Sequence, residues 1–269
     1  MRATIESFLK QKAMESGKLD LSSSLIFSSY GGSHLAGTNG VQSDIDVRAV
    51  NLLSDDYLIG INSFEHDKLT SGKNGITHQG DLDVEVYHCF PFIHRLMNGE
   101  TNTVEMAFAP KEKIIFVEDI FQPVLDNLDL FVSKNLIHHY RGLIFRHLNQ
   151  AQSSPDKVKK EERRQRILTY SYDTKEVMKA IMYLRIGIEF LRTGILRFHR
   201  TEDFKELIQF KNGAFLTFEE ANKYIQELLV IFNRELQTSK LPKTYNHDAV
   251  NHFVKEYHLT VFKQLGIVA

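Results

Sequence analysis

The chain has 269 residues and a formal net charge of -1, and 42% of its residues are hydrophobic. It is long enough to bury a large core, and its near-neutral charge excludes a global attraction to nucleic acid or to an anionic membrane. Any polyanion must therefore be bound by a local basic patch. The single cysteine, Cys89, excludes an intramolecular disulfide and a zinc site built from cysteines.

The sequence contains neither a recognisable signal peptide nor a candidate membrane span. Residues 1–10 lack the long apolar stretch of a signal peptide, and no run approaches the roughly 18 apolar residues that a spanning helix needs. We therefore expect a cytoplasmic protein that has no membrane partner.

Three short segments in the first half predict β-strands. Residues 25–27 are an apolar run that ends near a pair of glycines. Residues 44–50 alternate, with Asp44 and Asp46 on one face and apolar side chains on the other. Residues 81–87 repeat this pattern. Each alternating strand therefore has an apolar back, suited to packing on a core, and an acidic front.

Later in the chain the pattern favours helices. Four segments are predicted to be helical: residues 92–98, 134–152, 174–192 and 219–237. The chain is thus expected to be an α+β protein, with a mixed-sheet core followed by a mostly helical C-terminal region. The two predicted domains are residues 1–120 and 121–269.

The pair Asp44 and Asp46 points to metal chemistry. Carboxylates two residues apart on a strand point the same way and can hold two divalent cations close together. Such a pair of ions suits in-line phosphoryl transfer, because one activates the attacking hydroxyl and the other neutralises the leaving pyrophosphate. The preceding Gly32-Ser33 turn offers backbone N–H groups and a hydroxyl to a phosphate.

A third carboxylate on a neighbouring strand would complete this site. Asp83 and Glu85 are better placed than Asp81, which lies at the start of its strand, and Asp83 is favoured. A pair of aspartates can also arise by chance on the solvated face of a strand. The glycine–serine turn and the second acidic strand favour the functional interpretation over that one.

Lys175 is a candidate ligand for an anion. On a helical wheel it lies away from the apolar seam of residues 177–191, and a lysine near a helix N-terminus gains nothing from the helix dipole. A bound anion would explain its position, and a solvated surface lysine is the alternative.

Two segments resemble the DNA polymerase β nucleotidyltransferase superfamily: residues 32–37, Gly-Ser-His-Leu-Ala-Gly, and residues 43–48, Ser-Asp-Ile-Asp-Val-Arg. Within it the chain is similar to the RNA-ligase-associated predicted nucleotidyltransferases, which read Gly-Ser-x-x-Tyr-Gly, a short loop, then Ser-Asp-x-Asp. Residues 83–87 and 172–175 resemble later blocks of that family. Ala36 departs from it, because the family has tyrosine there.

The resemblance implies a metal-dependent enzyme of the EC 2.7.7 type, a nucleotidyltransferase. It would move an NMP from an NTP, with ATP expected, to an acceptor and release pyrophosphate. Residues 1–120 would form the catalytic core, and residues 121–269 would close the nucleotide cleft. The acceptor stays open, with an RNA or tRNA end among the candidates, and so does the oligomeric state.

The resemblance also implies a set of site residues and cofactors. Two Mg²⁺ or Mn²⁺ ions are expected. The implied catalytic residues are Asp44, Asp46 and Asp83. The implied metal ligands are these three together with Glu85. The implied nucleotide-binding residues are Gly32, Ser33, Ser43, Tyr172, Lys175 and Arg185.

Other interpretations of the sequence stay open. The basic stretch of residues 157–166 could bind an RNA backbone or form a solvated helix face. Arg141 and His147 have the Arg-x5-His spacing of HEPN-type ribonucleases, although on one helix the two side chains diverge. A non-catalytic nucleotide sensor on the same fold is a further alternative. Loss of activity on metal removal would separate a transferase from such a ribonuclease.

Overall fold

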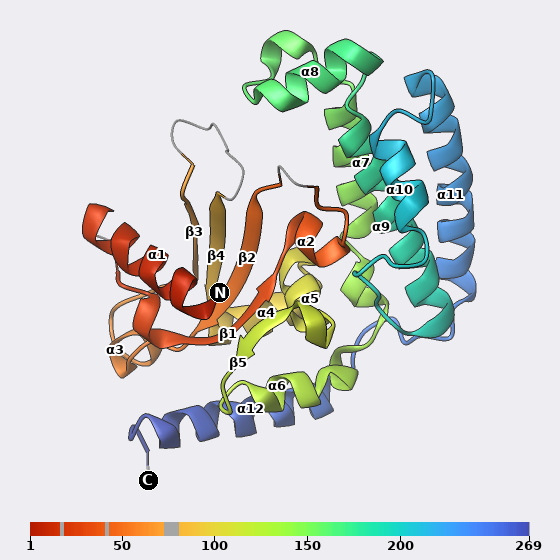
Figure 1. Ribbon diagram of the computed structural model, residues 1–269. Helices are drawn as coiled ribbons and strands as arrows, with labels where there is room; N and C mark the ends of the chain where they lie inside the picture. The colour runs from red at the N-terminus through yellow and green to blue at the C-terminus, as the bar shows by residue number, and fades with distance from the viewer. Residues whose placement is uncertain (17–18, 41–42, 73–80, 269) are drawn as a thin grey trace.

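The computed structural model describes residues 1–16, 19–40, 43–72 and 81–268. A five-stranded sheet occupies the N-terminal half, and a block of helices formed by α7 and α9–α11 stands beside it (Figure 1). The predicted α+β class, a mixed sheet followed by a mostly helical region, is thus confirmed. None of the described helices combines the length and the hydropathy that a membrane span needs.

The sheet has the strand order β3-β4-β2-β1-β5. Its strands are β1 (Leu25–Tyr30), β2 (Ile45–Asn51), β3 (His66–Thr70), β4 (Leu82–His88) and β5 (Ile114–Val117). The central pair, β2 and β4, is parallel, and the other neighbours are antiparallel. The three predicted strands are therefore present. The edge strands β3 and β5 were not predicted, because one is polar and the other is very short.

Six α-helices lie in the described part of the first half: α1 (Arg2–Ser16), α2 (Gly32–Ala36), α3 (Asp55–Leu58), α4 (Cys89–Met97), α5 (Thr101–Ala107) and α6 (Gln122–Asp126). The helix predicted over residues 92–98 begins earlier, at Cys89, because Pro91 lies in its first turn, where no intrahelical N–H is required. It ends before Gly99, which adopts a φ of 67°.

The described residues of the second half form six more α-helices: α7 (Tyr140–Ala151), α8 (Glu161–Tyr170), α9 (Thr174–Thr193), α10 (Phe204–Lys211), α11 (Phe218–Thr238) and α12 (His247–Gln264). The predictions for α9 and α11 are confirmed. The prediction of a single helix over residues 134–152 is wrong, because a short 3-10 turn, Lys134–Ile137, precedes α7. Asn135 explains the break, since its side-chain amide donates to the Met97 carbonyl at 2.6 Å and fixes the turn to α4.

Two clusters of buried apolar side chains surround the sheet. The smaller one joins α1 to the back of the sheet and includes Ile5, Val47 and Val84. The larger runs from Ile26 to Val261 through both halves of the chain. The two predicted domains, residues 1–120 and 121–269, thus share one continuous core. The apolar backs of β2 and β4 pack under α1, which leaves their acidic fronts facing the helices.

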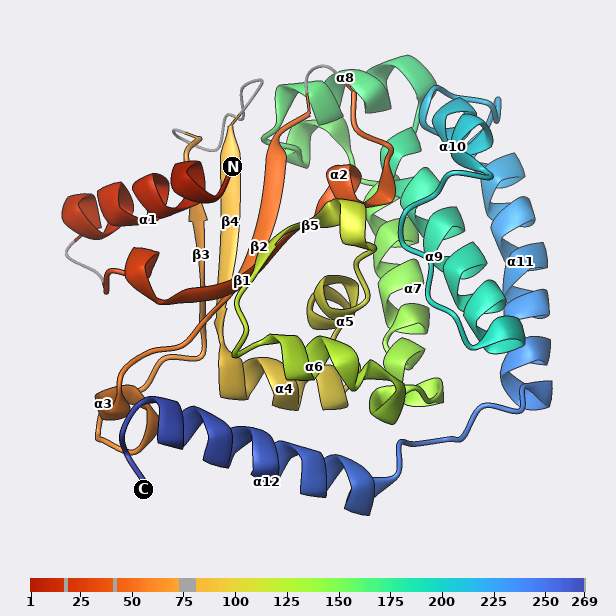
Figure 2. The same cartoon turned by 60° about the horizontal axis from the view of Figure 1, so that its bottom comes forward.

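The last helix, α12, returns to the first half and runs along α6 and α4 (Figures 1 and 2). The ring of His258 on α12 stacks on Phe90 of α4 with centroids 3.7 Å apart. His88, the N-cap residue of α4, accepts a hydrogen bond from Phe90 N at 3.4 Å. Burial lowers the pKa of His88 to about 4, and burial together with nearby His94 lowers the pKa of His258 to about 4. The packing of α12 on α4 therefore favours neutral rings.

Acid should weaken this packing. Because the folded-state pKa values lie below the ordinary histidine value of about 6.5, the stabilisation is complete above pH 6.5 and is lost as pH falls toward 4. We expect the free energy of unfolding, measured by urea denaturation at a series of pH values, to decline over this window. His258→Phe keeps the stacked ring without a titrating group and should flatten the decline, whereas exposed His247→Gln should not. An unchanged slope in His258→Phe would contradict this explanation.

Candidate active site

A cavity of about 440 Å³ lies between the acidic front of the sheet and the helices of the second half. This volume is within the usual range of ligand pockets, roughly 300–1,000 Å³. Seven of the residues predicted from the sequence line it: Gly32, Ser33, Asp44, Asp46, Asp83, Glu85 and Lys175. Ser43, Tyr172 and Arg185 do not line it.

The parallel pairing of β2 and β4 brings two aspartates together. Asp46 lies directly opposite Asp83 in the register, so both side chains leave the sheet on the same face. Asp44 immediately precedes β2 and lines the same cavity. Burial raises the pKa of Asp46, and the charges of Asp44 and Asp83 add to this effect against Arg48 and Lys68. The site therefore concentrates negative charge that a bound cation would relieve.

The start of α2 approaches Asp46 so closely that an added Cβ at Gly32 would meet the Asp46 carboxylate. Gly32 has a φ of 51°, and a Cβ built there would lie 2.1 Å from Asp46 Oδ2. The preceding Gly31 N donates to the Asp46 carbonyl at 2.9 Å. The glycine–serine turn of the sequence thus places the first residues of α2, including Ser33, over the carboxylates of β2.

Asp83 and Glu85 differ in how their oxygens are used. Glu85 accepts from the Tyr87 hydroxyl at 2.7 Å and from Asn102 Nδ2 at 3.0 Å. Asp83 Oδ1 is buried and has no hydrogen-bond partner among the described residues. Leaving a buried carboxylate oxygen without a partner is unfavourable, so this atom fits a bound cation. Of the two carboxylates, Asp83 therefore has the oxygen without a hydrogen-bond partner that a third metal ligand would need.

No three His, Cys, Asp or Glu side chains in the described part of the chain form a ready-made metal cage. Magnesium sites that also bind phosphates usually need only one or two protein carboxylates, because phosphate oxygens and water complete the coordination. Asp46 and the unpartnered Asp83 oxygen are donors of this type. The residues present thus fit divalent cations that arrive together with a polyphosphate.

Arg48 connects the acidic strand to the helices. Its guanidinium pairs with Glu105 of α5 and donates to Asn102 Oδ1 at 3.1 Å. The hydroxyl of Tyr183 on α9 donates to the other oxygen of Glu105 at 2.7 Å. Burial alone would lower the pKa of Arg48, but the charge of Glu105 and its hydrogen bond raise it. No sequence pattern indicated Glu105 or Tyr183 as partners, because both lie far along the chain.

Basic side chains form the opposite part of the cavity wall. Lys175 and Lys179 lie one turn apart on α9 and are joined by Arg146 and Lys160, whereas Lys68 lies on β3 opposite Glu85, on the sheet side of the cavity. Burial, with the charge of Lys179, lowers the pKa of Lys175. Among the described residues no carboxylate lies within ion-pair distance of Lys175. The helical spacing from Lys175 could have identified Lys179 in the sequence.

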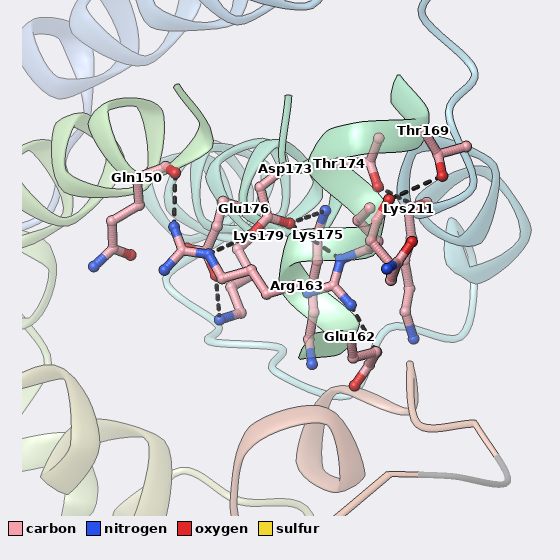
Figure 3. A network of polar contacts seen from close by, with 12 residues as sticks. Gln150, Glu162, Arg163, Thr169, Asp173, Thr174, Lys175, Glu176, Lys179 and Lys211 are labelled. Carbon is pink, nitrogen blue, oxygen red and sulfur yellow. Dashed lines mark hydrogen bonds and ion pairs between the residues drawn. The ribbon is translucent and has the colours of Figure 1, made fainter. Parts of the chain in front are cut away.

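The motif of residues 172–175 mainly builds the N-terminus of α9. Asp173 is fully buried, accepts from Lys175 N, and pairs with Arg163 and Arg166 of α8. Figure 3 shows this network, with the side chains of Lys175 and Lys211 extending from it in the same direction. Two arginines of the basic stretch at residues 157–166 thus hold the helix that carries Lys175.

The three predicted residues outside the cavity have other partners. Tyr172 is buried, and its hydroxyl donates to the Phe215 carbonyl at 2.9 Å. Arg185 pairs with Asp203 at 3.0 Å and Glu206 at 2.7 Å. The Ser43 hydroxyl accepts from Gly40 N at 2.9 Å.

The Arg-x5-His pair does not come together. Arg141 is exposed on α7, whereas His147 is buried and its Nδ1 lies 2.6 Å from Glu176 Oε2. The two side chains therefore lie on different faces of the helix, as the spacing predicted.

The fold and the cavity together define a class: an α+β protein with carboxylates on adjacent parallel strands facing a basic helical wall. Residues 1–257 match the model of the RNA repair pathway DNA polymerase beta family, and the chain belongs to that family. The family predicted from the sequence motifs is thereby confirmed.

Two individual proteins are similar to parts of the chain. An uncharacterized 38.9 kDa protein from the nrdC-mobD intergenic region of Enterobacteria phage T4 is 30% identical over 115 residues, which are 41% of this chain. The match covers 34% of that relative, so the chain spans about a third of its length. A nucleotidyltransferase-like protein from Exiguobacterium sibiricum 255-15 aligns over 87% of this chain and 75% of its own, with 12% identity and a TM-score of 0.29.

The fit of α2 against Asp46 can be tested with Gly32→Ala. The added Cβ meets Asp46 Oδ2, and a left-handed conformation costs a non-glycine residue about 1–2 kcal/mol, so we expect at least that loss in the free energy of unfolding. Urea denaturation measures it. Gly40→Ala is the matched control, because no atom of the described residues lies within 4 Å of the place that its Cβ would take, and stability should barely change. Equal stability of the two variants would contradict the close approach.

Proposed function

We propose that this protein is a metal-dependent nucleotidyltransferase that moves an NMP from an NTP, with ATP the expected donor, to an acceptor and releases pyrophosphate. The observation that supports it best is the pairing of Asp46 with Asp83 on adjacent parallel strands, across a cavity from Lys175. Membership of a DNA polymerase beta family agrees with this reaction type. When bound, two Mg²⁺ or Mn²⁺ ions would supply Lewis-acid activation and neutralise the developing charge.

We assign binding of the ions and of the acceptor to the acidic front of the sheet. Asp44 and Asp46 are proposed to hold both cations. Asp83 would hold the acceptor-side cation and receive the proton of the attacking hydroxyl. Glu85 is kept in the supporting network, because both of its oxygens already accept hydrogen bonds.

We assign binding of the triphosphate to the other parts of the cavity wall. The first residues of α2, Gly32 and Ser33, would hold the β- and γ-phosphates through N–H groups and a hydroxyl. Lys175 and Lys179 would neutralise their charge, since Lys175 has no carboxylate partner among the described residues. Ser43, Tyr172 and Arg185 are proposed to support the loop and the helices around the site from outside the cavity.

The acceptor is proposed to be a hydroxyl at an RNA end, which agrees with the family's description as an RNA repair pathway family. The assay would incubate the protein with each α-³²P-labelled NTP, Mg²⁺ or Mn²⁺, and total RNA, then follow label transfer and pyrophosphate release. Binding of NTP without pyrophosphate release under all these conditions would contradict transfer and favour a nucleotide sensor.

Asp46→Asn should separate activity from stability. We expect pyrophosphate release to fall by at least about 100-fold, because the variant removes a shared ligand of both ions. The free energy of unfolding should stay the same or rise, since the raised pKa of Asp46 means that its charge opposes folding at pH 7. Exposed Asp56→Asn on α3 is the control and should change neither quantity. Full activity in Asp46→Asn would exclude the mechanism.

Asp83→Asn and Glu85→Gln, measured side by side, would identify the third ligand. Asp83→Asn should abolish nearly all transfer and raise the Mg²⁺ concentration needed for half-maximal rate, because its unpartnered oxygen is assigned to the ion. Glu85→Gln should lower the free energy of unfolding by about 1–3 kcal/mol through lost charged hydrogen bonds, and leave the Mg²⁺ dependence unchanged. The reverse pattern would assign the ion to Glu85.

A further inference from the structure

A buried histidine–glutamate pair lies in the helical wall of the cavity. His147 on α7 and Glu176 on α9 are 5% and 7% exposed, and His147 Nδ1 lies 2.6 Å from Glu176 Oε2. The second oxygen of Glu176 lies 3.1 Å from Lys179 Nζ. His147 and Lys179 both line the cavity. The pair is therefore adjacent to the basic residues to which the triphosphate is assigned.

The hydrogen-bond geometry determines which nitrogen of His147 can exchange a proton. Although burial opposes it, the hydrogen bond from His147 and the charge of Lys179 lower the pKa of Glu176 to about 2. Glu176 is therefore a carboxylate at neutral pH and can only accept, so Nδ1 carries a hydrogen. Nε2 is the nitrogen that gains or loses a proton, and it has no hydrogen-bond partner among the described residues.

The ring of His147 is held in a single orientation. It stacks on Tyr183 with centroids 5.7 Å apart and an interplanar angle of 7°. Tyr183 is itself fixed by its hydrogen bond to Glu105. A carboxylate that holds one ring nitrogen, with the other directed to a cavity, is the arrangement that proton-transferring histidines use. If the pair only joined α7 to α9, apolar residues would serve with less desolvation, as they do elsewhere between these helices.

We propose that His147 is the proton donor to the pyrophosphate leaving group, and that Glu176 is the residue that positions it. This inference rests on the proposed function. The assignment to the leaving group follows from location, because His147 shares a wall with Lys179 and Lys175, whereas Asp83 on the sheet is assigned to the acceptor.

The step balances in protons and bonds. The acceptor oxygen forms a bond to the α-phosphorus, and the bond from that phosphorus to the α,β-bridging oxygen of the NTP breaks. That departing oxygen, which becomes a terminal oxygen of pyrophosphate, takes the proton from His147 Nε2, and the acceptor hydroxyl loses its proton on the Asp83 side. Solvent then restores the proton on His147. Proton donation of this kind contributes about 10²–10⁴-fold to a rate.

The test compares His147→Gln with the wild-type enzyme on ATP analogues that carry β,γ-CH₂ or β,γ-CF₂ groups. The CF₂ leaving group is less basic and needs less protonation. We expect His147→Gln to lower kcat by about 100-fold with ATP at nearly unchanged KM, and to lose less with the CF₂ than with the CH₂ analogue. Glu176→Gln should show a smaller loss in kcat with the same altered leaving-group dependence. Arg141→Gln, exposed on the same helix, is the matched control and should behave as wild type.

Each other outcome would overturn the proposal in a recognisable way. An unchanged leaving-group dependence in both His147→Gln and Glu176→Gln would leave the pair a structural contact. If His147→Gln does not fold, as circular dichroism would reveal, Glu176→Gln alone decides. If the wild-type protein were as inactive as Asp46→Asn, the proposed function itself would be contradicted. Metal-independent RNA cleavage that is lost in both His147→Gln and Arg141→Gln would assign His147 to a ribonuclease.

Discussion

The parallel pairing of β2 with β4 is the constraint on which the rest of the site depends. In this register Asp46 and Asp83 are neighbours on one face, whereas a shift of one residue would turn one of them into the core under α1. The next residue in each strand, Val47 or Val84, points to the opposite face and is completely or almost completely buried. This burial fixes the register. The same hydrophobic packing that stabilises the sheet therefore also brings the two carboxylates together.

Such a concentration of like charge needs compensation, and the protein supplies it only in part. Arg48 and Lys68 oppose the repulsion around Asp46, yet the pKa of Asp46 is still raised. Across the cavity the pKa of Lys175 is lowered, since burial and Lys179 disfavour its charge. The acidic wall thus disfavours its own negative charge, and the basic wall disfavours its own positive charge. The proposed ligand, a polyphosphate bound with divalent cations, would satisfy both walls at once, which neither a simple anion nor a metal ion alone would do.

What could be predicted from the sequence was what local periodicity encodes. The alternation around Asp44 and Asp46, and the long apolar seam of α9, each lie within one element and were correctly predicted. Strand β3 has partly exposed or exposed residues at every position, so it has no hydrophobic pattern to detect. The break before α7 depends on a hydrogen bond from Asn135 to Met97, which local propensity does not contain.

For the site, too, the sequence predicted the residues whose positions depend on local spacing. The seven predicted residues that line the cavity belong to short motifs, in which spacing fixes direction. Arg185 was predicted with them, but its environment is set by Asp203 and Glu206, which approach from a separate segment. His147 and Glu176 are 29 residues apart and on different helices, so no spacing rule connects them. Such long-range polar pairs can be recognised only from the packing of the helices in the structure.

The two walls of the cavity are also mechanically linked. Arg48 extends from the acidic strand to Glu105, Glu105 accepts from Tyr183, and Tyr183 supports the ring of His147. Glu105 and His147 are buried and Arg48 is largely so, which means that removing one partner would leave a charge or a hydroxyl without compensation. A polar network of this kind contributes little net stability compared with apolar packing, but it fixes distances. In a site where carboxylates on a sheet and basic groups on a helix must hold one ligand, a fixed distance between the walls is what the fold has to provide.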